Sequence, residues 1–355
     1  MRKKKTHILL SKDGETNMRL ILLVLTLTAM ITVVLAVGIG PVSVNPGTTL
    51  KVILNRVPGI SNRIQVDWGK LDENIVINLR LPRVLLGMIV GGSLAVTGVS
   101  MQALVRNKLA DPFILGVSSG ACAFATFGML FGAFSFLGKY ALSISAFLGA
   151  AATIMLVYVL SREGGKINIT QMLLSGVAIS MIMDGLTKVI TLSAPNALGL
   201  HNAEFWMSGS LAGAKWGYLT LPLVVMLLCM PVLMIHYRTL NALLLGEDTA
   251  GTLGVNVARM QKLLVLISSL LAGVTISVSG SIGFIGLMCP HIARLLVGAD
   301  HKKVLPVAAL LGGILVVWTD VAARMIIAPE ELPLGILTAI FGGPFFIVLL
   351  KKKNR

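Results

Sequence analysis

The sequence predicts an all-α polytopic membrane protein with about ten transmembrane helices. Two observations lead to this fold class. Of the 355 residues, 55% are hydrophobic and only 13% are charged, whereas a soluble domain carries about 25% charged residues. Apolar stretches close to the roughly 20 residues needed to cross a bilayer also fill most of the chain. Lipid is therefore expected to be the main solvent of this protein.

Ten apolar segments follow one another along the chain. They cover residues 20–40, 84–104, 113–134, 140–160, 168–192, 216–236, 260–280, 282–297, 304–327 and 333–350. They form a transmembrane domain at 20–350, between basic tails at 1–19 and 351–355. An even number of spans places both termini on one side. The segment 282–297 is short and contains Pro290, so we expect a tilted or broken helix packed inside the bundle.

The net charge of +15 is distributed as a topology signal. With both termini inside, the tails and inner loops hold eighteen Lys or Arg and the outer loops hold eight. This bias predicts a multi-pass protein of the bacterial inner membrane with cytoplasmic termini. It does not indicate a nucleic-acid partner. Six of the eight outer basic residues lie in 41–83, which is an exception to the bias.

A weak internal similarity links two of the segments. Residues 94–102 read LAVTGVSMQ and residues 276–284 read ISVSGSIGF. In the predicted topology the first helix runs inward and the second outward. Inverted repeats of this kind are common in transporters, so we expect an inverted-repeat bundle with membrane lipid around it.

The sequence lacks the common phosphate-binding and metal-binding patterns. The GxxxxGK[ST] phosphate-binding loop, HExxH and a His/Cys cluster are all absent. Cys122, Cys229 and Cys289 lie inside apolar stretches and form no CxxC pair. We therefore expect no catalytic residue, no metal site and no directly bound cofactor. If ATP drives this protein, a partner hydrolyses it.

Two acid–base pairs lie within the predicted spans. Asp184 and Lys188 are four residues apart on one helix, as are Asp320 and Arg324. Either pair can neutralise itself on one helix face as a structural couple. The alternative function is a secondary transporter driven by an ion gradient, with Asp184 and Asp320 in a relay.

The inner loop 237–259 is longer than the other inner loops. It carries helix-like apolar spacing, and Gly246 and Gly254 can divide it into two short helices. Spacing alone leaves two possibilities open: docking to another protein, or an amphipathic element resting on lipid.

Four stretches resemble the FecCD-type permeases, which import iron-siderophores, haem or cobalamin together with a paired ABC ATPase. They are LRLPRVLLGMIVGGSLAVTGVSMQALVRNKLADPFILGVSSGA at 79–121, LGEDTAGTLGV at 245–255, SGSIGFIGLMCPHIARLLVGADHKKVLP at 279–306 and ELPLGILTAIFGGPFFIVLL at 331–350. The resemblance implies a second permease subunit, identical or related, and two ABC ATPase subunits that use ATP and Mg. It also implies an extracytoplasmic substrate-binding protein, alternating access, and a metal chelate as cargo.

The resemblance assigns the loop at 245–255 to ATPase docking. In the family the equivalent segment forms the coupling helices that sit in a cleft of each ATPase subunit. The matching positions in this chain are Gly246, Glu247, Asp248, Ala250, Leu253 and Gly254. Glu247 and Asp248 are expected to cap the second short helix, because an acid at a helix start meets free N–H groups.

Arginines at the outer ends of the helices match a second family feature. Family members use outward-facing arginines to receive acidic residues of the binding protein. Arg80, Arg83 and Arg324 stand at matching positions, and guanidinium groups pair well with carboxylates. The opposing possibility is local pairing, which for Arg324 is with Asp320.

Candidates for the lining of the translocation path come from small and apolar positions in the second span. They are Gly92, Ser93, Val96, Ser100 and Met101. Asp184 and Lys188 depart from the family's usual apolar pattern in the fifth span. If they face the path, the cargo carries compensating polar groups.

Overall fold

The computed structural model describes residues 17–56, 59, 65–163 and 166–353. Seven helical stretches among them are long and apolar enough to cross a bilayer. They include α1 (Met18–Gly38), α4 (Leu81–Val105), α6 (Ala141–Leu160), α7 (Ile169–Leu192), α9 (Trp216–Ile235), α12 (Val257–Ser279) and α14 (His301–Met325). Three further apolar helices are α5 (Val117–Phe131), α13 (Ile285–Val297) and α15 (Leu334–Lys353).

These helices coincide with the ten predicted segments, and the all-α membrane fold is confirmed. α4 is longer than expected, because α3 (Lys70–Asn74) and the π-helical turn η2 (Ile75–Arg80) extend it without a break. The connecting elements are α2 (Pro46–Leu54), η3 (Pro112–Leu115), η4 (Ser135–Tyr140), α8 (Ala197–Met207), α10 (Tyr237–Leu243) and α11 (Glu247–Thr252), with the two-residue strands β1 (Arg162–Glu163) and β2 (Lys166–Ile167) paired antiparallel.

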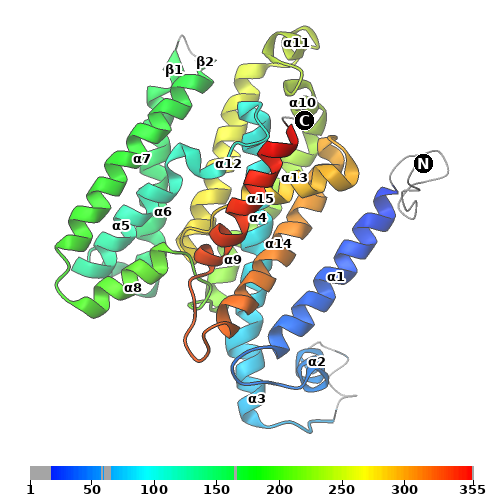
Figure 1. The fold of residues 1–355 in the computed structure, drawn as a ribbon, viewed down its shortest axis with the longest axis vertical. Coiled ribbons are helices and arrows are strands. Elements are labelled where there is room, and N and C mark those ends of the chain that lie inside the picture. Colours follow the sequence, from blue (N-terminus) through cyan, green and yellow to red (C-terminus); the bar gives the residue numbers. More distant parts are fainter. Residues whose placement is uncertain (1–16, 57–58, 60–64, 164–165, 354–355) are drawn as a thin grey trace.

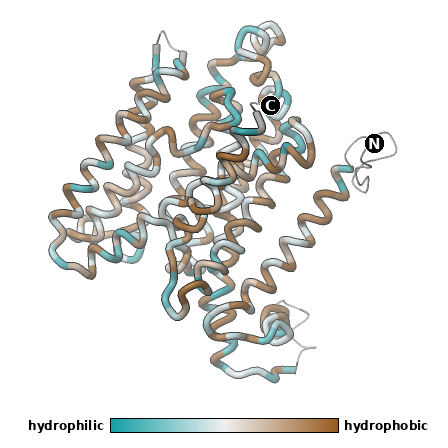
Figure 2. Tube along the Cα trace, viewed as in Figure 1, coloured by the Kyte–Doolittle hydropathy of each residue, from teal (hydrophilic) through white to brown (hydrophobic). Residues whose placement is uncertain are grey.

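The helices form a bundle with two distinct ends (Figure 1). α10, α11 and the β1–β2 hairpin lie at one end, called here the α11 end, and α2, α3 and α8 lie at the other, the α8 end. α1 begins and α15 ends at the α11 end, as an even number of spans requires. Figure 2 shows hydrophobic colouring along the long helices and more hydrophilic colouring toward the ends of the bundle, the pattern expected of a membrane protein.

α4 is the central helix of the bundle. Most of its residues are buried, and it packs against α9, α12, α13 and α14. Small residues allow this close approach. At Gly91 a Cβ atom would collide with the backbone of Gly312 on α14, and at Gly98 one would collide with the backbone of Gly286 on α13.

Of the two alternatives expected for 282–297, a tilted or a broken helix, the structure shows no break within α13. It is short, but it continues through Pro290 from Ile285 to Val297. Pro290 lies near the start of the helix, where few backbone hydrogen bonds precede it, and its side chain is buried. In Figure 1, α4 rises from α3 toward the α11 end, whereas α12 descends from α11. Opposite directions are consistent with an inverted repeat, which stays a prediction.

Candidate functional site

In Figure 1, α11 lies beyond the end of α12, and α10 connects it to the bundle. α10 ends at Leu243 and α11 begins at Glu247. Gly246 separates them with a φ of 109°, a backbone conformation that side chains other than glycine rarely adopt. The prediction of two short helices in 237–259 is confirmed.

Glu247 attaches α11 to the bundle. One of its carboxylate oxygens accepts hydrogen bonds from Arg106, at 2.9 Å, and from Gln261 on α12, at 3.2 Å. Arg106 directly follows α4. Glu247 and Asp248 stand in the first turn of α11 as predicted, but no side chain caps this helix. The predicted cap is therefore wrong, because Glu247 is engaged by two side chains of other elements.

Asn241 attaches α10 to the start of α14. Its amide nitrogen donates to Asp300 Oδ1 at 2.8 Å, and its amide oxygen accepts from the backbone N–H of His301 at 3.0 Å. Asp300 caps α14 by accepting from the Lys302 N–H at 3.0 Å. The segment is thus joined to α4, α12 and α14, so a movement of α10–α11 would be transmitted to three long helices.

Large apolar side chains are exposed on this segment beside polar ones. Leu245 is 64% exposed and Leu253 is 63% exposed. Of the other predicted coupling residues, Asp248 and Gly254 are exposed, whereas Ala250 is fully buried beneath them. Another protein or the membrane surface can cover exposed leucines of this kind.

Asp300 gives this attachment a pH dependence. Burial disfavours its carboxylate, but the hydrogen bonds from Asn241 and the Lys302 N–H, with the charge of Lys303, hold its pKa below the usual value. Because the folded-state pKa is depressed, the stabilisation is present above pH about 4 and is lost as pH falls through the folded value. We expect the difference in melting temperature between the wild type and Asp300→Ala to be largest near pH 7 and to shrink below pH 4. A difference that is constant over this range would contradict the carboxylate's role.

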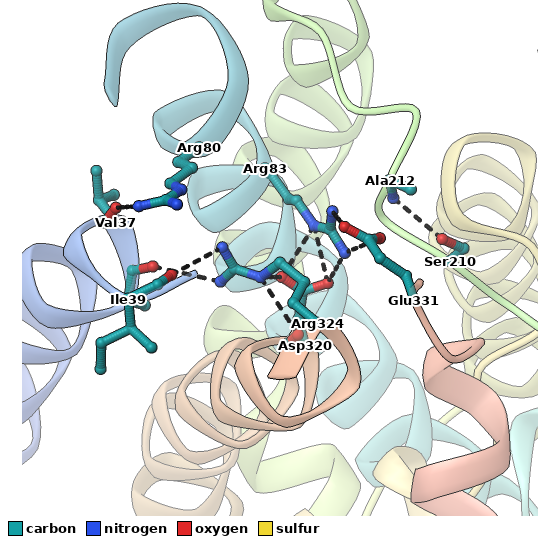
Figure 3. Close-up of polar contacts among 10 residues, drawn as sticks. Val37, Ile39, Arg80, Arg83, Ser210, Ala212, Asp320, Arg324 and Glu331 are labelled. Atoms are coloured by element: carbon teal, nitrogen blue, oxygen red, sulfur yellow. Dashed lines mark hydrogen bonds and ion pairs between the residues drawn. The ribbon is translucent and has the colours of Figure 1, made fainter. Parts of the chain in front are cut away.

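Arginines form a buried network at the α8 end (Figure 3). Arg83 binds Asp320 through Nε and Nη2, at 2.8–3.0 Å, and binds both oxygens of Glu331 at 2.9 Å. Arg324 pairs with Asp320 at 3.2 Å, one helical turn away. Asp320 therefore neutralises two guanidinium groups from α4 and α14.

The same network holds the end of α1. Arg80 donates to the carbonyl oxygens of Val37, Gly38 and Val42. Arg324 donates to the carbonyl oxygens of Ala36 and Ile39 at 3.3 Å. Carbonyls at a helix C-terminus lack intrahelical partners and carry partial negative charge, so cations are favoured there.

The expectation that Arg80, Arg83 and Arg324 face outward is wrong for this structure. Their exposed fractions are 7%, 8% and 2%. The physical reason is that each guanidinium finds carboxylates or helix-end carbonyls inside the chain. The open surface beside them is acidic instead: a hollow of about 680 Å³ between α8 and the segment 327–333 is lined by Glu204, Glu330, Glu331 and His201, among others.

The predicted path residues also lie elsewhere than expected. Ser93, Val96, Ser100 and Met101 are at most 1% exposed, and Gly92 is buried against Met226 on α9 and Ala309 on α14. They face helices of the same chain because α4 is enclosed on several sides. In this structure they pack the subunit core and do not line an open path.

Asp184 and Lys188 are both exposed on α7. No ion pair joins them to each other or to another residue in the part of the chain that the structure describes. α7 also exposes large apolar side chains, such as Leu174 and Met181. Because Asp320 is held by two arginines at one end of the bundle and Asp184 lies apart on α7, the two acids do not form the relay that an ion-driven transporter would need.

Sequence reasoning missed the residues that attach the α10–α11 segment to the bundle. Arg106, Asn241 and Gln261 lie 141, 59 and 14 residues from their partners. No local pattern relates such positions. The only signal for Arg106 was a charge at the end of an apolar span.

Comparisons with known proteins relate most of the chain to one transport family. The sequence model of the FecCD transport family matches residues 27–352. The hemin transport system permease protein HmuU of Yersinia pestis is 41% identical over 283 residues, which cover 79% of this chain and 84% of that protein. The ferric enterobactin transport system permease protein FepD of Escherichia coli is 39% identical, over 80% of this chain and 84% of that protein.

A cobalamin import system permease protein, BtuC of Halobacterium salinarum, is 38% identical over 79% of this chain and 74% of its own length. Among solved structures, one described as an inward-facing conformation of a metal-chelate type ABC transporter superposes with a TM-score of 0.81. It is 34% identical, and the match covers 94% of this chain and 99% of that one.

Proposed function

The chain belongs to the FecCD transport family, and we propose that it carries a metal chelate across the membrane as the permease subunit of an ABC importer. It is a transport subunit and not an enzyme, and ATP is hydrolysed by a separate subunit. A transporter driven by an ion gradient is not supported. The observation that carries the proposal is the projecting α10–α11 segment, with leucines exposed on its surface and anchors to three long helices at its base.

The α10–α11 segment, called here the coupling segment, is placed to transmit movement of the ATPase to the long helices. When the ATPase subunits close on ATP, they move the segment that is seated in them. Glu247 passes this movement to the end of α4 and to α12, and Asn241 passes it to the start of α14. Since α4 packs closely against α14, the two long helices would shift together, and the path between two permease subunits would open to one side or the other.

The proposed cargo, a metal chelate, is based on the substrates named for the relatives. Hemin, cobalamin and ferric enterobactin, named for three of them, are all bulky metal chelates. A bulky cargo suits a path between two subunits, because this chain is densely packed inside. The second subunit is identical or related, two ATPase subunits use ATP and Mg, and an extracytoplasmic binding protein delivers the chelate. The permease itself contributes no covalent chemistry.

Binding-protein docking is proposed at the α8 end. With the termini and α11 cytoplasmic, this end faces outward. Docking through Arg80, Arg83 and Arg324 stays a prediction, and it requires these groups to exchange their present partners. Glu331 is the partner at the surface, since its side chain is 27% exposed whereas that of Asp320 is 2% exposed.

The ATPase contact is tested by co-purification. We expect the ATPase expressed with this chain to be captured by the wild type and to be lost, at least tenfold, from the double variant Leu245→Asp, Leu253→Asp. Two charges would then replace two apolar contacts in the interface. The matched control is Leu198→Asp on α8, because Leu198 is 71% exposed at the opposite end. Equal capture of the ATPase by all three proteins would refute the assignment of α10–α11.

A further inference from the structure

A groove of about 360 Å³ runs between α6 and α12. Its walls are almost entirely apolar: α6 contributes Phe147, Ile154 and Met155, and α12 contributes Val265, Leu266 and Leu270. Met155 is 63% exposed and Leu266 is 56% exposed, so the groove is open to the surroundings of the bundle. The lining residues differ from those that anchor the α10–α11 segment and from those of the arginine network.

One end of the groove is basic. Lys262 and Tyr158 form the lining at the α11 end. Arg162, just beyond α6, places its guanidinium 5.9 Å from the centre of the Tyr158 ring. Lys262 and Arg162 are exposed, and neither forms an ion pair with a carboxylate among the described residues. The opposite end, at Phe147 and Gly273, carries no charge.

The length of the groove matches one leaflet of a bilayer. From Tyr158 to Phe147 on α6, and from Lys262 to Gly273 on α12, the lining covers eleven residue steps. At 1.5 Å per residue each wall is about 16 Å long. Half of the roughly 30 Å hydrocarbon core of a membrane has nearly the same thickness. The basic end therefore falls at the level of the headgroups and the apolar end near the bilayer centre.

From this arrangement we propose a binding site for an anionic glycerophospholipid. An acyl chain lies in the groove between α6 and α12, and the phosphate group is held by Lys262 and Arg162, with the Tyr158 hydroxyl beside it. Two unpaired cations at one end of an apolar groove complement an anionic headgroup with a hydrocarbon tail. The proposal does not depend on the cargo or on the ATPase.

Lipid retention by the purified full-length chain tests the site. The chain is extracted in a mild detergent, mixed with phosphatidylglycerol or with phosphatidylcholine of the same acyl chains, and the bound lipids are counted by native mass spectrometry. We expect selective retention of phosphatidylglycerol. Removing one cation, in Lys262→Gln or Arg162→Gln, should lower its retention about fivefold, the effect of one basic group near an anionic headgroup.

Two further variants separate the charge from the groove. Ala151→Phe fills the groove, since Ala151 is exposed on its wall, and it should lower retention while both cations remain. Lys302→Gln removes another exposed cation at the α11 end, outside the groove, and should change nothing. Equal retention of the two lipids by the wild type, unchanged retention in Lys262→Gln and Arg162→Gln, or a second polypeptide found in the groove instead of lipid would each overturn the proposal.

Discussion

Replacing Asp320 by alanine is expected to destabilise the chain by about 3–5 kcal/mol, because it leaves buried guanidinium groups without their counter-charge. Asp320 is the common partner of Arg83 and Arg324, and all three side chains are at least nine-tenths buried. Truncating one member of a buried, hydrogen-bonded set costs far more than removing a surface pair. In detergent the melting temperature should fall by on the order of 5 °C, given the usual entropy of unfolding per residue.

The matched control is Asp67→Ala. Asp67 also lies at the α8 end of the bundle, where it forms an ion pair with Lys51, but its side chain is 55% exposed. The melting temperature of Asp67→Ala should therefore change by less than about 1 °C. Equal changes in the two variants would contradict the structural role of the arginine network. That result would also favour arginines that are free to dock a partner.

Replacing Gly91 by leucine should prevent the bundle from assembling. Gly91 and Gly312 lie against each other where α4 crosses α14, and a Cβ on either one would collide with the backbone carbonyl of the other. Backbone atoms cannot rotate away as a side chain can. We expect Gly91→Ala to cost about 1–3 kcal/mol, and Gly91→Leu to yield no monodisperse protein in size-exclusion chromatography.

Gly185→Ala is the control for this prediction. Gly185 is also a helical glycine, but no atom lies within 4 Å of a Cβ built there. Alanine should be neutral or slightly stabilising at this exposed position of α7, since it favours a helix more than glycine does. A folded, normally stable Gly91→Leu protein would mean that α4 and α14 do not cross as closely as described.

The membrane spans could be predicted because their signal is local. A run of about 20 apolar residues is a span wherever it occurs, and all ten runs became helices within a few residues of the expected bounds. α8 was missed because it has only eleven residues and includes polar side chains such as His201 and Glu204. The extension of α4 by α3 and η2 was missed because Asp72 and Glu73 interrupt the apolar pattern.

The burial and the partners of Arg80, Arg83 and Arg324 could not be predicted in the same way. Their charge and their place at the ends of the spans favoured an outward direction. Arg80 is held inward by carbonyl groups some forty residues upstream, and Arg83 by carboxylates 237 and 248 residues downstream. The carbonyl partners of Arg324 lie 285 and 288 residues upstream. Only the pairing of Arg324 with Asp320, one turn apart, was visible in the sequence.

The small residues on α4 show a second reason why the sequence alone does not predict the path lining. Ser93, Val96 and Ser100 suit a path lining and a tight helix crossing equally well, because both need small side chains. The neighbour across the contact decides between them, and here it is another helix of the same chain. The coupling segment was different, since Gly246 and the apolar spacing around it predicted both of its short helices.

The central claim is that this chain imports a metal chelate by means of a partner ATPase. Its most direct test is uptake into proteoliposomes that contain this chain, its ATPase and its binding protein, with hemin, cobalamin and a ferric siderophore supplied in turn. We predict that at least one chelate accumulates when ATP is present, that an ionophore leaves this uptake unchanged, and that mutation of the phosphate-binding lysine of the ATPase abolishes it. Uptake that persists in the ATPase variant and collapses with the ionophore would contradict the account.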